Sequence, residues 1–232
     1  SDNTVQVYFG AAGYTTDGIT SEGFNAFERA QFQAAFDLIS AVTNITFSQV
    51  SSAGAADFRL VLDTNEFTSN TSLAYFYPPG FGTNTGTGVF NGAAWDRLAG
   101  GDLERGGYSF NTIVHELLHG LGLSHTHDTG GSSSTMLGVS GPFNSYGLDF
   151  LNQGVFISMS YNSGYHTGGA GTLGQTFGAG GTWGHGVGPM ALDIAVLQSL
   201  YGANTNTAAG GNVYTLPTAD GGGTFWESIW DT

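Results

Sequence analysis

Residues 115–125 read His-Glu-Leu-Leu-His-Gly-Leu-Gly-Leu-Ser-His, which places three imidazoles and one carboxylate close together in the chain. Residues four apart on an α-helix differ by about 40° in direction and about 6 Å along the axis, so His115 and His119 point from one face at one ion. Glu116 is turned by about 100° from His115, which keeps its carboxylate out of the ligand set but near that ion. The spacing therefore predicts a helix that carries a metal site.

Gly122 predicts where this helix ends, because glycine adopts a positive φ at little cost. The turn brings His125 back toward the same ion as a third ligand. Zinc held by three protein groups keeps its fourth position for water, as catalytic zinc sites do. The alternative, in which these histidines cap a helix or lie in a core, requires the spacing to arise by chance in a chain with only 6 histidines.

A second motif follows at Ser158-Met159-Ser160-Tyr161. The pattern HExxHxxGxxH, followed by a methionine turn of this form, resembles the serralysin group of the metzincin zinc peptidases. The resemblance covers about residues 20 to 232 and implies an α+β, metzincin-like fold. We then expect a twisted mixed sheet of about five strands, packed on long helices that include the active-site helix and a C-terminal helix, with an irregular glycine-rich lower part.

The resemblance also implies roles for the site residues. Zinc would be held by His115, His119 and His125, and Glu116 would act first as general base and then as general acid. Tyr161 matches a displaceable fifth zinc ligand that then stabilises the oxyanion, and its alternative role is that of a buried core tyrosine. Met159 would form a hydrophobic floor under the histidines, because a thioether is too soft to compete with imidazole for zinc.

An apolar strand is predicted at residues 73–77, before Pro78-Pro79-Gly80. Proline fits an edge position because it cannot donate to a ladder. In the family that the chain resembles, the strand at this place borders the cleft and binds extended substrate by β-augmentation. The residues that would bind substrate are Leu73, Ala74, Tyr75 and Phe76, although an ordinary strand without substrate contact is the alternative.

Local patterns predict the other elements. The spacing of Asn25 and Glu28 predicts a capping box at the first helix, with an apolar face at Phe32, Phe36 and Ile39. Alternating residues predict half-buried strands at 44–50 and 57–62, besides short strands at 5–9 and 88–91. We expect Ser109 or Asn111 to cap the helix that carries the zinc ligands. For the last helix, we expect Pro189 in its first turn and Gly202 at its end. Asp193 of the last helix is expected to support the methionine turn by a hydrogen bond.

Composition limits the partners. The 232 residues carry a formal net charge of −14, with four arginines as the basic side chains, and contain no cysteine. Such an acidic surface repels phosphate backbones and anionic lipids, so neither nucleic acid nor a membrane is an expected partner. Protein or peptide substrates are expected instead, and we expect a monomer. The charge also serves simple solubility.

Domain organisation follows from the resemblance. We expect a catalytic domain at 1–205 and, at 206–232, a connection toward an absent C-terminal calcium-binding β-roll, which suggests a trimmed or processed chain. Calcium is therefore a second expected cation beside zinc. His127 departs from the serralysin pattern, and a rival or auxiliary zinc ligand at this position is an open alternative. His166 and His185 are expected to be solvated.

Three functions remain open on the sequence. The resemblance favours a secreted, extracellular bacterial endopeptidase that cleaves extended protein chains. A narrower zinc amidase or peptidase would keep Glu116 catalytic but narrow the cleft. A non-catalytic zinc-binding module would not need that carboxylate.

Overall fold

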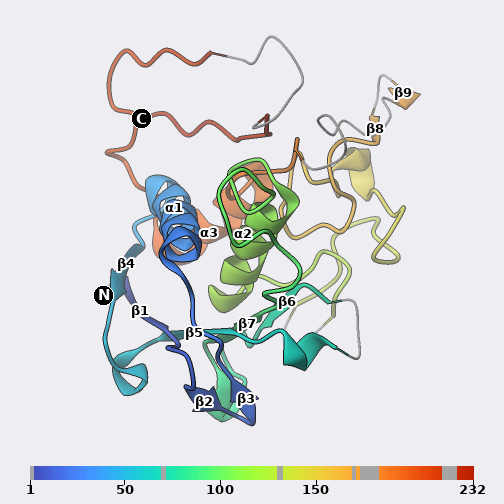
Figure 1. The fold of residues 1–232 in the computed structure, drawn as a ribbon. Coiled ribbons are helices and arrows are strands. Elements are labelled where there is room, and N and C mark those ends of the chain that lie inside the picture. The colour runs from blue at the N-terminus through green and yellow to red at the C-terminus, as the bar shows by residue number, and fades with distance from the viewer. Residues whose placement is uncertain (1–2, 69–71, 130–132, 169–170, 173–182, 216–223) are drawn as a thin grey trace.

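The computed structural model describes residues 3–68, 72–129, 133–168, 171–172, 183–215 and 224–232. A five-stranded mixed sheet lies beneath three α-helices (Figure 1). The strand order is β4 (Thr46–Gln49), β1 (Thr4–Phe9), β5 (Phe58–Leu62), β7 (Thr87–Phe90) and β6 (Ala74–Phe76). The first four strands are parallel, and β6 is antiparallel to β7 at the edge. The α+β, metzincin-like fold is thereby confirmed.

The helices are α1 (Ala26–Val42), α2 (Tyr108–Gly120) and α3 (Ala191–Tyr201). The short elements are β2 (Thr15–Thr16), β3 (Ile19–Thr20), β8 (Thr167–Gly168), β9 (Gly171–Thr172) and the single 3₁₀ turns η1 (Ala53–Ala55), η2 (Asn65–Phe67), η3 (Gly82–Asn84) and η4 (Leu148–Phe150). No helix within the described ranges is long and apolar enough to cross a lipid bilayer. Much of the predicted glycine-rich region, at 169–170 and 173–182, lies outside the described residues.

The capping box predicted for α1 is confirmed. Asn25 Oδ1 accepts from the Glu28 N–H at 2.9 Å, and Glu28 Oε2 accepts from the Asn25 N–H at 2.7 Å. Phe32 and Ile39 are fully buried on the predicted face, and the ring of Phe32 meets that of Phe90 edge to face at 4.9 Å. Burying each such side chain contributes about 1.5–3 kcal/mol, so this aromatic layer fixes α1 on the sheet.

Strand β5 corrects the prediction of a half-buried strand. Leu60, Val61 and Leu62 are all fully buried. Leu60 and Leu62 belong to the core under the helices, while Val61 belongs to a second cluster that includes Ile19 of the β2–β3 hairpin. A central strand covered on both faces loses the alternation that a one-sided strand shows.

The sheet positions the helix that carries the histidines. A Cβ at Gly120 would lie 2.6 Å from Phe76 Cε1 and 2.7 Å from Phe58 Cζ, so glycine lets α2 approach the sheet closely. The prediction that Ser109 or Asn111 caps α2 is wrong, because the N-cap is Gly107. Both side chains point elsewhere: Ser109 Oγ donates to Asp102, and Asn111 Nδ2 donates to the carbonyl of Gly186.

Helix α3 ends at Gly202 as predicted, with φ +83°. Pro189 does not lie in its first turn, because the N-cap is Met190 and proline precedes it. The N–H of Met190 donates to Asp193 Oδ2 at 2.9 Å, so this carboxylate caps the helix.

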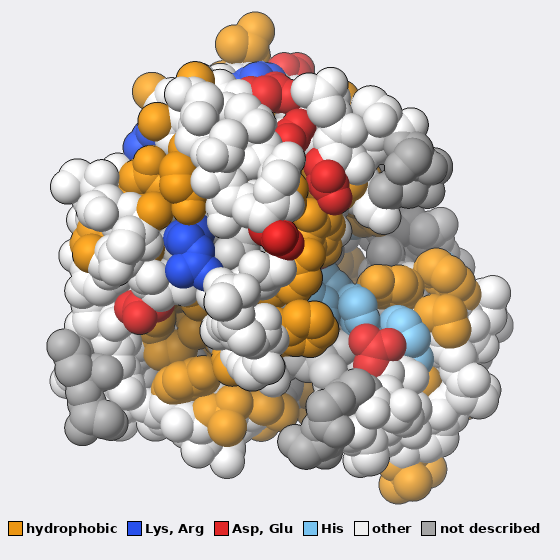
Figure 2. Space-filling view, turned by 90° about the horizontal axis from the view of Figure 1, so that it is seen from below, with side chains coloured by type: hydrophobic (Ala, Val, Ile, Leu, Met, Phe, Trp, Pro, Cys, Tyr) orange, Lys and Arg blue, Asp and Glu red, His pale blue; other side chains and the backbone are white. Residues whose placement is uncertain are grey.

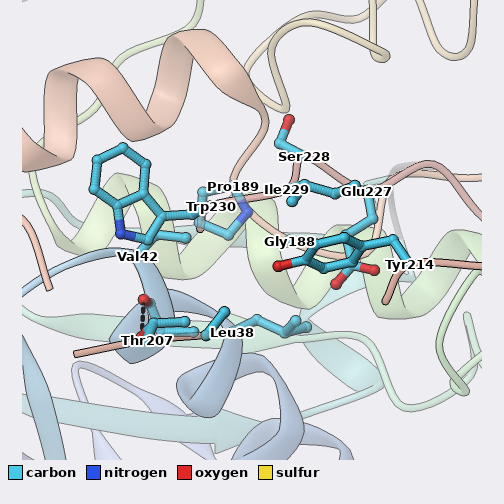
Figure 3. Close-up of a pocket in the computed structure, with 12 residues that line it drawn as sticks. Leu38, Val42, Gly188, Pro189, Thr207, Tyr214, Glu227, Ser228, Ile229 and Trp230 are labelled. Atoms are coloured by element: carbon cyan, nitrogen blue, oxygen red, sulfur yellow. Dashed lines mark hydrogen bonds between the residues drawn. The ribbon is translucent and has the colours of Figure 1, made fainter. Parts of the chain in front are cut away.

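The described residues of the C-terminal segment, 203–215 and 224–232, lie over the helices, along the top of Figure 1. Trp230 Nε1 donates to the Asn204 carbonyl at 2.7 Å, and Thr207 Oγ1 donates to the Ala41 carbonyl at 2.5 Å. Residues of this segment enclose a pocket with Leu38 and Val42 of α1 (Figure 3).

The prediction that His185 is solvated is wrong, because its side chain is buried and its ring lies 5.0 Å from that of Tyr108.

Candidate metal centre

The structure brings the three predicted histidines together. His115 and His119 lie one turn apart on α2, and Gly122, with φ +97°, turns the chain back toward His125. His125 Nε2 lies 3.1 Å from His115 Nε2 and 3.0 Å from His119 Nε2. Figure 2 shows histidines gathered in a hollow of the surface, with an acidic side chain beside them and hydrophobic side chains around.

Each of the three imidazoles is fixed through its other nitrogen. His115 Nδ1–H donates to the Ser158 carbonyl at 2.8 Å, and His119 Nδ1–H donates to the Leu123 carbonyl at 2.7 Å. His125 Nδ1–H donates to Asp128 Oδ2 at 2.6 Å. Carbonyl and carboxylate oxygens only accept, so the proton of each ring lies on Nδ1 and the lone pair lies on Nε2.

This arrangement fits a bound cation. Three Nε2 lone pairs that point at one another repel unless a positive charge lies between them. Three neutral imidazoles whose outer nitrogens bond to carbonyl or carboxylate oxygens are the ligand set of catalytic zinc. Burial also lowers the pKa of His119 to about 4, which keeps this ring neutral and able to ligate.

Glu116 lies beside the three imidazoles with 7% of its surface exposed. Its Oε2 is buried without a hydrogen-bond partner in the described part of the chain, and burial raises the pKa of its carboxyl to about 8. A buried carboxyl group without a protein partner is costly, and a nearby cation counters that cost. This environment makes Glu116 a candidate for a group that exchanges a proton at the site.

The methionine turn reaches the metal centre through its backbone. Ser158, whose carbonyl holds His115, donates its N–H to Asp193 Oδ2 at 2.6 Å. The predicted support from the last helix is thus present, and it reaches His115 through Ser158. Met159 is 1% exposed within the main core cluster.

Tyr161 is 40% exposed, which excludes its alternative role as a buried core tyrosine. Its ring lies 4.7 Å from that of His125 and 6.0 Å from that of His115. Phe143 supports it from the other side at 5.5 Å. Partial burial raises the pKa of the Tyr161 hydroxyl, so this group keeps its proton and can donate it in a hydrogen bond.

Asp128 lies at the site, although no role was predicted for it. It is the third residue after His125, a separation at which a turn brings two side chains together, and this spacing was the available signal. His127 stacks on His125 with ring centroids 5.0 Å apart and lies outside the three-histidine set. Burial lowers the pKa of His127 as well.

Two hollows at the metal centre share Glu116 and Tyr161 among their lining residues. We name them after one lining residue each. The Asn111 hollow is lined by Leu73, Asn111, Thr112, Phe143 and Ser160. The Pro79 hollow is lined by Tyr75, Pro79, Phe81, His119 and Asp128. Ala74 lines both, so the edge of the sheet runs along both hollows.

Fold and site together are those of a metzincin-type zinc peptidase domain. The sequence profile described as Matrixin matches residues 13–139, more than half of the chain. The chain therefore belongs to the Matrixin family of peptidases, and its relatives identify it as a catalytic domain of the serralysin type.

Three relatives illustrate this likeness. Metallopeptidase AprA of Pseudomonas marginalis is 32% identical over 82% of this chain and 37% of its own length. Serralysin A of Dickeya chrysanthemi is 32% identical over 92% of this chain and 41% of its own length. Serralysin of Photorhabdus luminescens is 27% identical over 82% of this chain and 36% of its own length. The chain thus spans about two fifths of the length of these relatives.

Proposed function

We propose that this chain is the catalytic domain of an exported bacterial endopeptidase that cleaves extended protein chains with Glu116 as its general base. The observation that carries the proposal is the convergence of three Nε2 atoms, with that of His125 lying 3.1 Å from that of His115 and 3.0 Å from that of His119. Beside them lies the buried carboxyl of Glu116, whose Oε2 has no hydrogen-bond partner among the described residues, and two open hollows share this place.

His115, His119 and His125 would hold zinc. Bound zinc supplies Lewis acidity toward a carbonyl oxygen and toward water. Glu116 takes the proton of the attacking water, because it is the carboxylate that borders both hollows at the histidines. It then passes this proton to the leaving amine, so the peptide bond breaks without a covalent intermediate. The Tyr161 hydroxyl donates a hydrogen bond to the oxyanion that develops on the carbonyl.

Strand β6 supports a direction for the substrate. The Leu73 carbonyl accepts from the Asn91 N–H, and the Tyr77 N–H donates to the Thr87 carbonyl. Because antiparallel ladders alternate, the backbone groups of Ala74 and Phe76 point away from β7. A peptide paired antiparallel there runs from the Pro79 hollow toward the Asn111 hollow. Residues on the amino side of the cleaved bond then occupy the Pro79 hollow, and those on the carboxyl side occupy the Asn111 hollow.

The wider setting belongs to the proposal as well. The likeness to serralysins supports an extracellular bacterial enzyme and residues 206–232 as a connection toward a calcium-binding domain. Calcium, the monomeric state and the exclusion of nucleic acid and membranes stay predictions, and so do the floor role of Met159 and the substrate contacts of residues 73–76.

The test pairs metal analysis with casein digestion for the wild type, Glu116→Gln and the exposed control Asp37→Asn on α1. We expect all three to bind zinc, and Glu116→Gln to lose at least about 100-fold in turnover, as loss of a general base does. The control should match the wild type. Casein digestion by zinc-loaded Glu116→Gln at the wild-type rate would remove Glu116 from the mechanism. Wild-type cleavage of small amides but not of casein would indicate a narrower amidase.

A further inference from the structure

His127 is an imidazole at the site that the proposed reaction does not use. Its ring stacks on His125 with an interplanar angle of 14° and meets the edge of Tyr161 at 4.9 Å. Its side chain is 14% exposed, and its Nδ1 is buried without a hydrogen-bond partner in the described ranges. The other three histidines of the site each have Nδ1 fixed by an acceptor, whereas Nδ1 of His127 has none and its Nε2 faces the carboxylate of Asp128.

Asp128 divides its two oxygens between two rings. Oδ2 accepts from His125 Nδ1 at 2.6 Å, whereas Oδ1 faces His127 Nε2 at 3.5 Å. The second distance is long for a hydrogen bond to nitrogen. It suits two ligands of one ion, because atoms bound tetrahedrally to zinc at about 2.0–2.2 Å lie about 3.4 Å apart. The side chain of Asp128 is 42% exposed, so water reaches the space beside it.

We propose that His127 Nε2 and Asp128 Oδ1 form a second zinc site beside the three-histidine centre. His125, His127 and Asp128 are together a group whose ligand atoms lie within 4.8 Å of one another. Two protein ligands and water complete this second site, which therefore binds zinc more weakly than three imidazoles do. One imidazole and one carboxylate favour zinc over calcium, which takes 6–8 oxygen ligands.

The second site regulates turnover through its position. Asp128 and Tyr161 both line the Pro79 hollow, so an ion held by Asp128 lies at the wall of the hollow that the proposed function assigns to the substrate. The same ion also binds the Asp128 carboxylate, which orients His125. Excess zinc therefore inhibits the enzyme. This inhibition rests on the proposed function, whereas binding of the second ion does not.

Zinc titration of the metal-free chain tests the proposal, with free zinc set by a competing chelator and bound zinc measured per chain. The variants are His127→Phe, which keeps an aromatic ring against His125 and Tyr161, His127→Gln, and the control His166→Gln. Among the described residues, the ring of His166 belongs to no group that could hold a metal. Cobalt spectra provide a second readout, because a second ion beside the first adds its own bands.

We expect the wild type and His166→Gln to bind a second ion after the first, and both His127 variants to bind only the first. The zinc concentration that halves casein digestion should rise at least about tenfold in the His127 variants, since even outer-shell changes cost 10- to 100-fold in metal affinity. A second step that survives in both His127 variants, or that is equally lost in His166→Gln, overturns the proposal. If His127→Phe also loses the first ion, the number of zinc ions bound by His127→Gln decides between one site and two. Absence of the first ion in the wild type would instead contradict the proposed function.

Discussion

The carboxylate of Glu28 offers the sharpest test of how the fold is held together. It is 0% exposed and accepts four hydrogen bonds. Arg97 donates two of them, from Nε at 2.7 Å and Nη2 at 3.0 Å, and Trp95 donates one from Nε1 at 3.1 Å. The fourth comes from the Asn25 N–H of the capping box. This cluster therefore joins the start of α1 to the segment that leads into α2.

Replacing Arg97 by methionine leaves a buried carboxylate with two of its four donors. Breaking a buried pair from one side costs about 3–5 kcal/mol. The side chain of Arg97 is 36% exposed, so solvent screens part of the loss, and we expect the lower end, about 3 kcal/mol. For a domain of this size, that free energy lowers Tm by about 6–12 °C.

Denaturant unfolding of zinc-free protein measures this loss, with Arg105→Met as the matched control. Arg105 forms its ion pair with Glu227 on the surface, where the two side chains are 45% and 42% exposed. Exposed pairs contribute about 1 kcal/mol or less. The double variant Glu28→Gln/Arg97→Met should be less destabilised than the sum of its single changes, because it leaves no buried charge. A cost for Arg97→Met no larger than that for Arg105→Met would refute the reasoning.

The other predictions concern the metal centre and its supports. Tyr161→Phe should lower kcat about 10²-fold with KM and zinc content unchanged, as loss of one oxyanion donor does, and an unchanged kcat would contradict that role. Gly122→Ala should cost about 1–2 kcal/mol in unfolding experiments, because the new Cβ would only reach ordinary contact with Pro79 Cγ at 3.9 Å and left-handed strain at φ +97° remains. Gly122→Asn should cost less, and equal costs would exclude strain as the cause. Burial raises the pKa of the Asp193 carboxyl from 3.8 to about 6, so its protonation stabilises the fold below about pH 4 and this stability is lost as pH rises through 6. Relative to Asp193→Asn, the free energy of unfolding of the wild type should fall by about 3 kcal/mol from pH 4 to 7. Parallel pH profiles of the two proteins would contradict the shift. Zinc at 100 times its Kd should raise Tm by about 5–11 °C over chelated protein, and an unchanged Tm would exclude tight binding to the folded state.

Local spacing was sufficient for the features that a single turn of chain determines. The ligands at 115, 119 and 125 lie on one helix and the turn after it, and the capping box at Asn25 spans three residues. Helical geometry, the glycine turn at 122 and the capping pattern are all local signals, and together they predict both features.

The errors arose where distant segments meet. Val61 is buried against the β2–β3 hairpin, and Asn111 donates to the Gly186 carbonyl instead of capping its helix. His185 is buried because Tyr108 of α2 packs against it. Each of these contacts depends on tertiary packing, which periodicity and capping patterns do not encode.

The way in which the ligand imidazoles are anchored sets what mutation can and cannot change. Backbone carbonyls at positions 158 and 123 orient two of the rings, and no side-chain replacement deletes a carbonyl. The ring of His125 is the exception, because a replaceable carboxylate orients it. Selection for altered zinc affinity should therefore concentrate its outer-sphere substitutions at Asp128, leaving the geometry of the other two ligands inherited with the fold.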